Sequence, residues 1–523
     1  MKSEIVCVFF VEKEAVMDQW HNFEHKITAP FSKDLKAIEK VVENLFQDCD
    51  DVIKKEFQNT KRKEEKIYIC YIDGLINRDI LEESVIRPFL NHVGEEQEDW
   101  FSSILSETLE TVDVKEVYEM DQMIEAILGG DTAIFADGYE KGLVLSSKGF
   151  PTRGVAPTES EVVLRGSKDS FNENFRQNTA LIRRRIKDTR LKLKQSTVGF
   201  RSRTNVGLLY MDDLVEPELV KQIEQQLKEI KIDGIFDNGM LEHLLEKETL
   251  SPFPQFQHTE RPDKTASGIL EGRIAIVVDN SPGVLLVPVT LHCFFQASDD
   301  YYNRFYVASF ERFLRYMAAL IAIGLPGLYI AIFNFHTEVL PTSLVLSFAS
   351  ARLGVPFPVV VELLLMELAF EMLREAGVRM PGQMGNTIGV VGGLIVGQTA
   401  VEAGLVSTIV VIVVSLTAIA SFSIPSESFT SAFRLMKFIL IATCALWGIY
   451  GFFLGMLFVL IHLCSLDSYG IPYLLPTVSS SVAEYGTKKD YIGKAPIGMM
   501  KERPIFTRRG ARVRMRENKK KQS

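Results

Sequence analysis

The sequence lacks the short motifs that mark common classes of enzyme. It contains no G-x-x-x-x-G-K-[ST] loop, no strand-linked G-x-G-x-x-G, no H-E-x-x-H and no G-x-S-x-G, the patterns that bind nucleotides, hold zinc or present a nucleophilic serine. Its six cysteines are scattered without C-x-x-C spacing, which favours a reduced compartment and gives no sign of a disulfide framework or a metal site. We therefore expect a protein that is not an enzyme, with no cofactor and no bound metal.

Three stretches lack Asp, Glu, Lys and Arg altogether: residues 317–335, 405–424 and 438–461. A helix of about 20 residues crosses the hydrocarbon core of a bilayer, so each stretch is long enough to span it. Three such runs close together are poorly explained as buried helices of a soluble core. The sequence predicts a helical membrane domain over residues 305–465, with charged regions before and after it.

Basic residues flank this membrane domain on both sides. Arg304, Arg312 and Arg315 precede the first span, and the tail from Lys501 to Lys521 holds ten Lys or Arg against two Glu. No secretory signal opens the chain, because its first apolar run, residues 5–11, is short and flanked by acids. Both termini are therefore expected on the cytoplasmic side, after an even number of crossings, with a basic cytoplasmic tail over residues 466–523 beside anionic lipid.

The charged front half repeats itself weakly. Residues 67–90 and 206–230 each read as an apolar strand, a Tyr-x-Asp ending and an amphipathic helix. Residues 132–146 and 274–288 each read as two apolar strands around an Asp-Gly or Asp-Asn turn, which is a hairpin signal. We infer an N-terminal extension over residues 1–31 and two soluble α/β subdomains, residues 32–150 and 205–300.

A basic segment, residues 151–204, is expected to link the two subdomains. Residues 178–194 look helical and include Arg183, Arg184 and Arg185. One interpretation is a solvated charged helix, and the other is a basic interface for an acidic neighbour or lipid head groups. Nucleic acid is not expected as a partner, because the whole chain has a net charge of −9 and the segment lacks interleaved aromatic residues.

The natural fourth span, residues 357–373, carries carboxylates. On a helix Glu367 and Glu371 share one face, whereas Glu362 stands well off that stripe. Because a carboxylate at the centre of a bilayer costs about 2.5–3.5 kcal/mol, the segment either lies at the membrane interface or stands in a bundle with its acids lining a polar passage. The even number of crossings favours the passage, with Glu362, Glu367 and Glu371 as candidate pore-lining residues.

Glycines recur every four residues just after this segment, at Gly385, Gly389, Gly393 and Gly397. Such a ridge of bare backbone lets another helix pack closely in a membrane. The apolar part, residues 388–400, is too short to span comfortably, so a re-entrant or short packed helix is expected. The predicted membrane domain thus has about four spans plus this Gly-rich helix.

The block formed by residues 356–425 resembles the signature region of the A subunits of spore germinant receptors, the GerA family of endospore-forming bacteria. Residues 162–188, 271–288, 466–476 and 495–504 are also similar to the family pattern. The resemblance extends from about residue 32 to residue 505. It also covers a related spore-membrane paralogue associated with the dipicolinate channel, so the subtype stays open.

The resemblance implies an integral protein of the spore inner membrane with a cytoplasmic pair of N-terminal subdomains. It further implies a transporter-like B subunit and a lipoprotein C subunit as partners, and a homo-oligomer that conducts monovalent cations when a nutrient germinant binds. A non-conducting scaffold or signal transducer is one alternative. A secondary transporter is the other, although the membrane half shows no inverted repeat.

Overall fold

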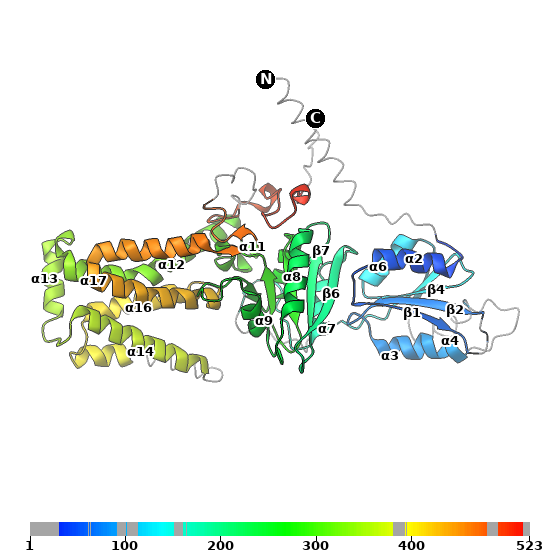
Figure 1. Ribbon diagram of the computed structural model, residues 1–523, viewed down its shortest axis with the longest axis horizontal. Coiled ribbons are helices and arrows are strands. Elements are labelled where there is room, and N and C mark those ends of the chain that lie inside the picture. Colours follow the sequence, from blue (N-terminus) through cyan, green and yellow to red (C-terminus); the bar gives the residue numbers. More distant parts are fainter. Residues whose placement is uncertain are drawn as a thin grey trace, which may run out of the picture.

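The computed structural model describes residues 31–60, 62, 64–91, 101, 113–150, 161–163, 165–379, 393, 395–478 and 490–515. Two α/β units lie side by side, and a group of long helices extends from the second unit on the side away from the first (Figure 1). The N-terminal extension expected over residues 1–31 lies almost wholly outside the described residues.

The first unit is a five-stranded sheet in the order β1-β2-β4-β5-β3, with every neighbouring pair antiparallel. Its strands are β1 (Val52–Gln58), β2 (Lys66–Ile72), β3 (Val114–Val117), β4 (Thr132–Ala136) and β5 (Gly142–Leu145). Helices α2 (Leu35–Leu45) and α6 (Met120–Leu128) cover one face of the sheet. The other face carries the short helices α3 (Arg78–Leu81), η1 (Glu82–Ile86) and α4 (Arg87–Asn91).

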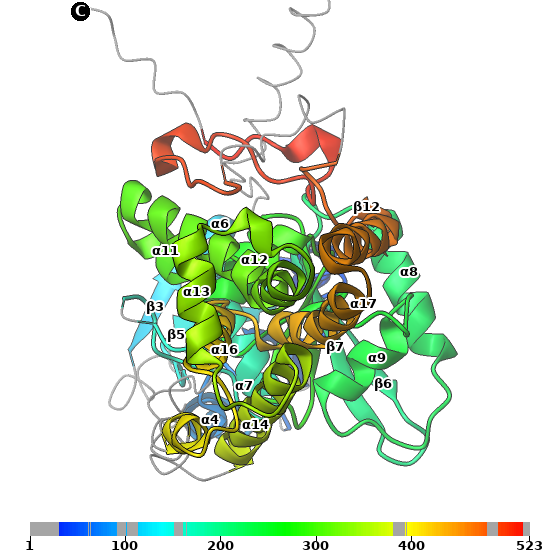
Figure 2. The same ribbon diagram turned by 90° about the vertical axis from the view of Figure 1, so that its left-hand side faces the viewer.

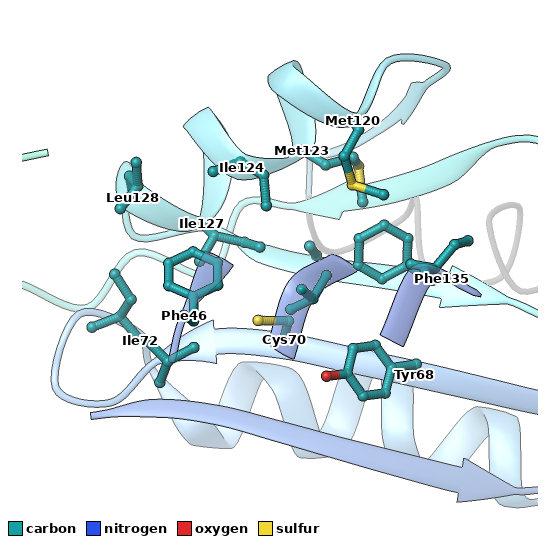
Figure 3. Close-up of a cluster of buried hydrophobic side chains, with 14 of the residues drawn as sticks. Phe46, Tyr68, Cys70, Ile72, Met120, Met123, Ile124, Ile127, Leu128 and Phe135 are labelled. Carbon is teal, nitrogen blue, oxygen red and sulfur yellow. The ribbon is translucent and has the colours of Figure 1, made fainter. Parts of the chain in front are cut away.

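The core of this unit follows from two periodicities in the sequence. Alternate residues of β2, namely Tyr68, Cys70 and Ile72, point to the face covered by α6, where Met123 and Ile127 meet them (Figure 3). The intervening residues of β2 pack on the opposite face. A period of two on the strand and of 3.6 on the helix thus builds one buried layer on each side of the sheet.

The second unit repeats this plan. Its sheet has the order β6-β7-β9-β10-β8, which matches the first sheet strand for strand. Its strands are β6 (Leu191–Val198), β7 (Thr204–Met211), β8 (Gln257–Thr259), β9 (Ile274–Val278) and β10 (Val284–Val287). Helices α7 (Phe175–Arg183) and α10 (Pro262–Leu270) pack on one face, and α8 (Pro217–Glu229) and α9 (Asn238–Leu245) on the other. The internal repeat expected from the sequence is confirmed.

The segment expected to be a basic linker contributes to the second unit. Helix α7 ends at Arg183, and the chain then turns into the edge strand β6, whereas the sequence predicted one helix over residues 178–194. Leu191 and Leu193 are buried while Lys192 and Lys194 are partly exposed. Leu193 on this edge strand forms a backbone bridge to Cys49 of the first unit, and the two lysines hide the alternation that would identify the strand.

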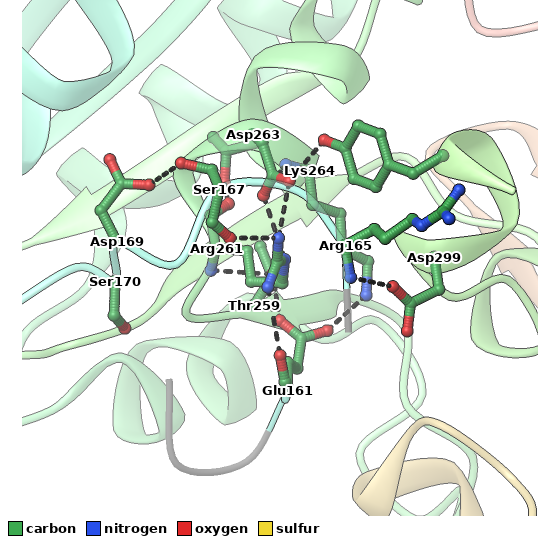
Figure 4. A network of polar contacts seen from close by, with 12 residues as sticks. Glu161, Arg165, Ser167, Asp169, Ser170, Thr259, Arg261, Asp263, Lys264 and Asp299 are labelled. Atoms are coloured by element: carbon green, nitrogen blue, oxygen red, sulfur yellow. Dashed lines mark hydrogen bonds and ion pairs between the residues drawn. The ribbon is translucent and has the colours of Figure 1, made fainter. Parts of the chain in front are cut away.

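Arg261 fixes the segment before α7 onto the second unit (Figure 4). Its guanidinium is fully buried, pairs with Asp263 and donates hydrogen bonds to the carbonyl oxygens of Glu161 and Ser167 at 3.2 and 2.9 Å. Lys264 pairs with the Glu161 carboxylate. The described part of the segment between the two units is therefore held against α10.

The helices beyond the second unit are α12 (Phe305–Phe335), α13 (Thr342–Ala351), α14 (Val359–Arg379), α16 (Thr408–Phe422) and α17 (Glu427–Ser465), with residues 395–402 also helical. Among the described residues, only α12 and α17 contain an apolar stretch that is long enough, by length and composition, to cross a membrane. Helix α14 carries the acids noted above, and α16 has 15 residues. Figure 2 shows α12, α14, α16 and α17 gathered next to one another.

Helix α17 doubles back on itself at Gly448, which has a left-handed φ of 59°. A Cβ atom on Gly451 would lie 2.0 Å from the Thr443 carbonyl oxygen, and one on Gly455 would lie 2.4 Å from Cδ1 of Leu440. In a straight helix these pairs would stand about 12 and 22 Å apart. The run 438–461, expected as one span, is instead divided between two antiparallel arms that touch through glycine.

The chain after α17 returns to the second α/β unit. Arg508 donates to the carbonyl oxygens of Asp212 and Val215, and Arg503 donates to that of Leu270 at 3.0 Å. A Cβ atom on Gly272 would lie 2.8 Å from the backbone of Thr507. Part of the basic tail is therefore docked on the second unit.

Candidate functional site

The three candidate pore-lining carboxylates occupy two different places on α14. Glu362 is fully buried and accepts hydrogen bonds from Arg352, at 3.2 and 3.0 Å, and from the backbone N–H of Ser407, at 3.0 Å. Arg352 follows α13, and Ser407 is the N-cap of α16. Glu362 thus fastens the ends of two helices to α14, on the side away from the other two acids.

Glu367 and Glu371 meet basic residues of the first arm of α17. Lys437 forms an ion pair with Glu367 and lies 3.5 Å from Glu371, and Arg434 lies 3.4 Å from Glu371. Residues three or four apart on a helix lie on one face, so an acidic stripe on α14 faces a basic stripe on α17. The helix bundle thus pairs both carboxylates with basic side chains of the same chain.

These side chains line a cavity of about 380 Å³ between α14, α16 and the first arm of α17. Arg374 adds a third cation, which donates to the Ser421 hydroxyl at 2.7 Å and lies over the Phe422 ring at 4.7 Å. The cavity therefore combines charges of both signs with an aromatic wall. Its lining comprises Ala322, Glu367, Phe370, Glu371, Leu373, Arg374, Gly377, Thr417, Ala418, Ser421, Phe422, Ile424, Thr430, Phe433, Arg434 and Lys437.

Sequence reasoning found the acids of this site and missed its cations. Arg434 and Lys437 lie three residues apart immediately before the charge-free run 438–461. That spacing at the start of a span was the available signal for a basic stripe. Because Glu367 and Glu371 face this cavity inside one chain, a role in lining a pore between copies stays a prediction.

The structure describes two of the four glycines of the predicted ridge. A Cβ atom on Gly397 would lie 3.3 Å from Cγ1 of Val411 in α16, and one on Gly393 would lie 3.8 Å from the ring of Phe370 in α14. Gly397 therefore sits at a close helix contact of the expected kind. Gly385 and Gly389 lie outside the described residues.

The three arginines of the predicted basic interface point to different partners within the chain. Arg183 is 1% exposed and binds both carboxylate oxygens of Asp51 at 2.7 Å, which joins the second α/β unit to the first. Arg185 pairs with Asp169, and Arg184 lies over the Phe150 ring at 5.1 Å. The acidic neighbour of Arg183 thus belongs to the same chain, and its buried guanidinium is closed to an external partner.

A second buried charge cluster joins the second α/β unit, the start of α12 and the C-terminal segment. Arg312 is fully buried and binds Asp300 at 3.2 Å and Asp490 at 2.7 Å. Nearby, burial and then the Arg312 charge lower the pKa of His292 to about 3. The neutral imidazole bridges the hydroxyls of Tyr316 and Thr477, at 2.7 and 3.2 Å.

Within the described residues, no three His, Cys, Asp or Glu side chains are close enough together to hold a metal ion. Paired α/β units of one topology are thus joined to a bundle of apolar helices, which encloses a charged cavity and includes two helices long and apolar enough to cross a membrane. The sequence matches the model of the family described as Bacillus/Clostridium GerA spore germination protein over residues 40–506. The chain belongs to the GerA family.

Similar proteins agree with this assignment. Spore germination protein A1 of Bacillus subtilis is 42% identical over 368 residues, which cover 70% of this chain and 76% of that protein. Spore germination protein KA of the same organism is 38% identical over 464 residues, 89% and 85% of the two chains. The protein named uncharacterized membrane protein YfkQ, also from B. subtilis, is 39% identical over 483 residues, 92% and 93% of the two.

The crystal structure of the N-terminal domain of the A subunit of the Bacillus megaterium spore germinant receptor GerK3 also matches. It is 24% identical, with a TM-score of 0.39, and the match covers 49% of this chain and 96% of that domain.

Proposed function

We propose that this chain is the A subunit of a nutrient germinant receptor in the spore inner membrane, with both termini on the cytoplasmic side. Its partners are a transporter-like B subunit and a lipoprotein C subunit. Copies of the chain assemble into a channel that releases monovalent cations when germinant binds. The family match over residues 40–506 and the relatives named spore germination proteins support this role.

The placement of the helix ends supports one side for both termini. Arg312, near the start of α12, binds Asp490 of the C-terminal segment at 2.7 Å. His462, near the end of α17, contacts the Ser251 hydroxyl of the second α/β unit at 2.9 Å. The first helix thus starts, and the last helix ends, beside the same polar domain, as the positive residues at both ends require.

The charged cavity is the observation that carries the channel proposal. Anchoring a protein in a membrane needs no carboxylates, so buried ionisable groups in such helices mark a functional site. Carboxylates can replace part of the hydration shell of a cation. In the described arrangement the Lys437 ammonium pairs with the carboxylates of both Glu367 and Glu371. We therefore take this arrangement as the closed state, in which a movement of α17 against α14 exchanges the Lys437 ammonium for a passing cation.

The test compares three variants in spores and in reconstituted membranes. Glu367→Gln combined with Glu371→Gln should lower germinant-triggered potassium release and single-channel conductance by about tenfold or more, because the cation loses its ligands. Lys437→Gln should raise the basal cation leak. Glu375→Gln is the matched control, since Glu375 lies on the same helix but is exposed, and it should conduct like the wild type.

Two alternative functions give different results in the same assay. Each of the three acids already has a basic partner within the chain, which favours a non-conducting scaffold or signal transducer. In that case the double variant germinates and releases potassium normally, and the channel assignment fails. The cavity within a single chain also suits a secondary transporter, for which saturable uptake would be lost while single-channel events would never be seen.

A further inference from the structure

The turn over residues 248–251 follows α9 and carries a leucine at its tip. The backbone N–H of Ser251 donates to the carbonyl oxygen of Glu248 at 3.0 Å, which closes the turn. Leu250 lies within it and is 97% exposed, the highest value among the large apolar side chains that the structure describes. Single exposed leucines are common on protein surfaces, so the surroundings of the turn decide what this side chain contacts.

The turn is fixed to the end of α17. The Ser251 hydroxyl contacts Nε2 of His462 at 2.9 Å. The Gln255 side chain is 3% exposed and holds the turn from inside, because it accepts from the backbone N–H of Glu248 at 3.2 Å and donates to its carbonyl oxygen at 2.9 Å. Leu250 is therefore exposed on a turn that is anchored to the base of the helix bundle.

The face of α17 next to this turn is apolar and exposed. Four residues of its last turns are 49–61% exposed, namely Leu457, Phe458, Leu460 and Ile461. In the membrane placement proposed above, these side chains face the acyl chains of lipid. Ile461 directly precedes His462, the residue that contacts the turn. The apolar face of α17 thus ends where the Leu250 turn meets the helix.

Contacts between aromatic rings link the turn to the matching level of α12. The centroid of the Phe253 ring lies 5.9 Å from that of Phe429. The Phe295 ring lies 5.3 Å from Phe429 and 4.2 Å from Tyr316, again between centroids. The charge-free stretch 317–335 begins directly after Tyr316, and a hydrocarbon core of about 30 Å takes about 20 residues of helix. Both α12 and α17 therefore place the edge of the hydrocarbon core at the level of the turn.

We infer that the Leu250 turn dips into the head-group layer of the bilayer, so that the second α/β unit rests on lipid at this point. The bilayer is the occupant because the neighbouring apolar face of α17 continues directly to the turn. One leucine would not hold a protein on a membrane by itself, but α12 and α17 keep the turn at the surface, so that a weak contact forms at high effective concentration. This contact requires the membrane placement proposed above and is independent of cation conduction.

The first experiment measures the depth of the turn by electron paramagnetic resonance. The full-length protein in liposomes carries one nitroxide label, at Leu250→Cys, at Ile461→Cys or at the control position, Phe200→Cys. The background carries Cys7→Ser and Cys464→Ser, and the other four cysteines are buried. Collisions are measured with oxygen, which is enriched in lipid, and with a polar nickel chelate, which stays in water.

Phe200 is a matched control because it is exposed in the same unit but far from the helices. It is 67% exposed in the turn between β6 and β7. The Leu250 turn leads into β8, the opposite edge of the sheet, and β7 is three strand positions away from β8. Neighbouring strands are about 4.8 Å apart, so this separation is roughly 14 Å. Figure 1 shows β6 on the side of the first unit, away from the long helices.

The label at position 250 should collide with the nickel chelate at least about threefold less often than the label at position 200, and the label at position 461 at least about tenfold less often. Equal collision rates at positions 250 and 200 overturn the inference. If position 461 is also as open as position 200, the membrane placement of α17 fails too, which separates the two failures. A label at position 250 that is shielded from both probes is covered by protein, and the inference is then wrong.

The second experiment needs no label. Because Leu250 is almost fully exposed, Leu250→Asp should keep the fold, but its carboxylate should lift the turn out of the head-group layer. In nanodiscs, peptides covering residues 246–256 should then exchange their amide hydrogens at least about tenfold faster than in the wild type. Phe200→Asp, the control, should leave the exchange of these peptides unchanged. Equal exchange in Leu250→Asp and the wild type contradicts the lipid contact.

Discussion

Replacing Asp51 by Asn should loosen the joint between the two α/β units. Asp51 is fully buried, and Arg183, its partner, is 1% exposed. The guanidinium makes two hydrogen bonds of 2.7 Å to the carboxylate and a third, of 2.8 Å, to the carbonyl oxygen of Leu191 at the start of β6. The pair thus joins the residue before β1 to the end of α7, and the third bond links α7 to the start of β6.

The expected loss of folding stability follows from the unpaired charge that each substitution leaves in the interior. Removing one partner of a buried ion pair strands the other charge away from water, which costs about 3–5 kcal/mol. Asp51→Asn and Arg183→Met should each fall in this range. The double variant Asp51→Leu with Arg183→Met removes both charges, so it should be less destabilised than the sum of the two single changes, and by a margin of at least about 2 kcal/mol.

Hydrogen exchange of the full-length protein, read by mass spectrometry, measures this loss segment by segment. Peptides from β1 and β6 should exchange at least about a hundredfold faster in each single variant, whereas peptides from α12 should keep their rates. The control is Lys33→Gln, which breaks a pair of 3.9 Å whose side chains are both 67% exposed, and it should change nothing measurable. Additive effects in the double variant, or unchanged exchange in β1 and β6, would refute the reasoning.

Two further predictions concern the glycine hairpin and one partly buried acid, Glu271. Gly451→Ala should prevent the two arms of α17 from closing and abolish stable folding, because its Cβ atom would lie 2.0 Å from the Thr443 carbonyl oxygen. Gly324→Ala, whose nearest neighbour lies at 3.4 Å, should keep the thermal midpoint in detergent close to that of the wild type. Burial, and then the Asp490 carboxylate, raise the pKa of Glu271 from 4.5 to about 7. The folded protein therefore binds more protons than the unfolded chain between these values, stability falls as pH rises through them, and Glu271→Gln should flatten that part of the melting profile; an unchanged slope would contradict this assignment.

The repeated α/β plan could be predicted from sequence because its signals are local. A strand such as β4 is a continuous apolar run that ends at an Asp-Gly turn, and β9 ends at Asp-Asn in the same way. The amphipathic helix α8 follows β7 at once and carries its own period. Comparing two such stretches within one chain therefore predicted both α/β units, although not the outer strands of their sheets, without knowledge of any contact.

The edge strand β6 could not be predicted in this way. Lys192 and Lys194 interrupt its apolar residues, and the run of arginines before it continues the appearance of a charged helix. The Arg183 side chain, at the end of α7, turns inward to Asp51, 132 residues away in the sequence. Local patterns carry no information about a partner at that distance.

The partners of the charged residues in the cavity could not be predicted from local patterns either. The acids on α14 are visible as an i, i+4 pair, but the partner of Glu367 is Lys437, 70 residues further on. The left-handed backbone of Gly448 and the reversal of α17 likewise depend on the packing of the two arms. The sequence thus predicted that Glu367 and Glu371 share one face of a helix, but not the cations that they meet.

The return of the C-terminal segment to the second α/β unit has a mechanical consequence. That unit is joined to the helices by the covalent link into α12 and by the chain that leaves α17. A third connection is Arg312, which forms ion pairs with both Asp300 and Asp490. A domain attached at one point can rotate freely, whereas a domain attached at several points moves together with the helices to which it is attached. We therefore expect any tilt of the second unit to turn the base of α12 with it, so that a movement of the α/β half is passed on to the long helices.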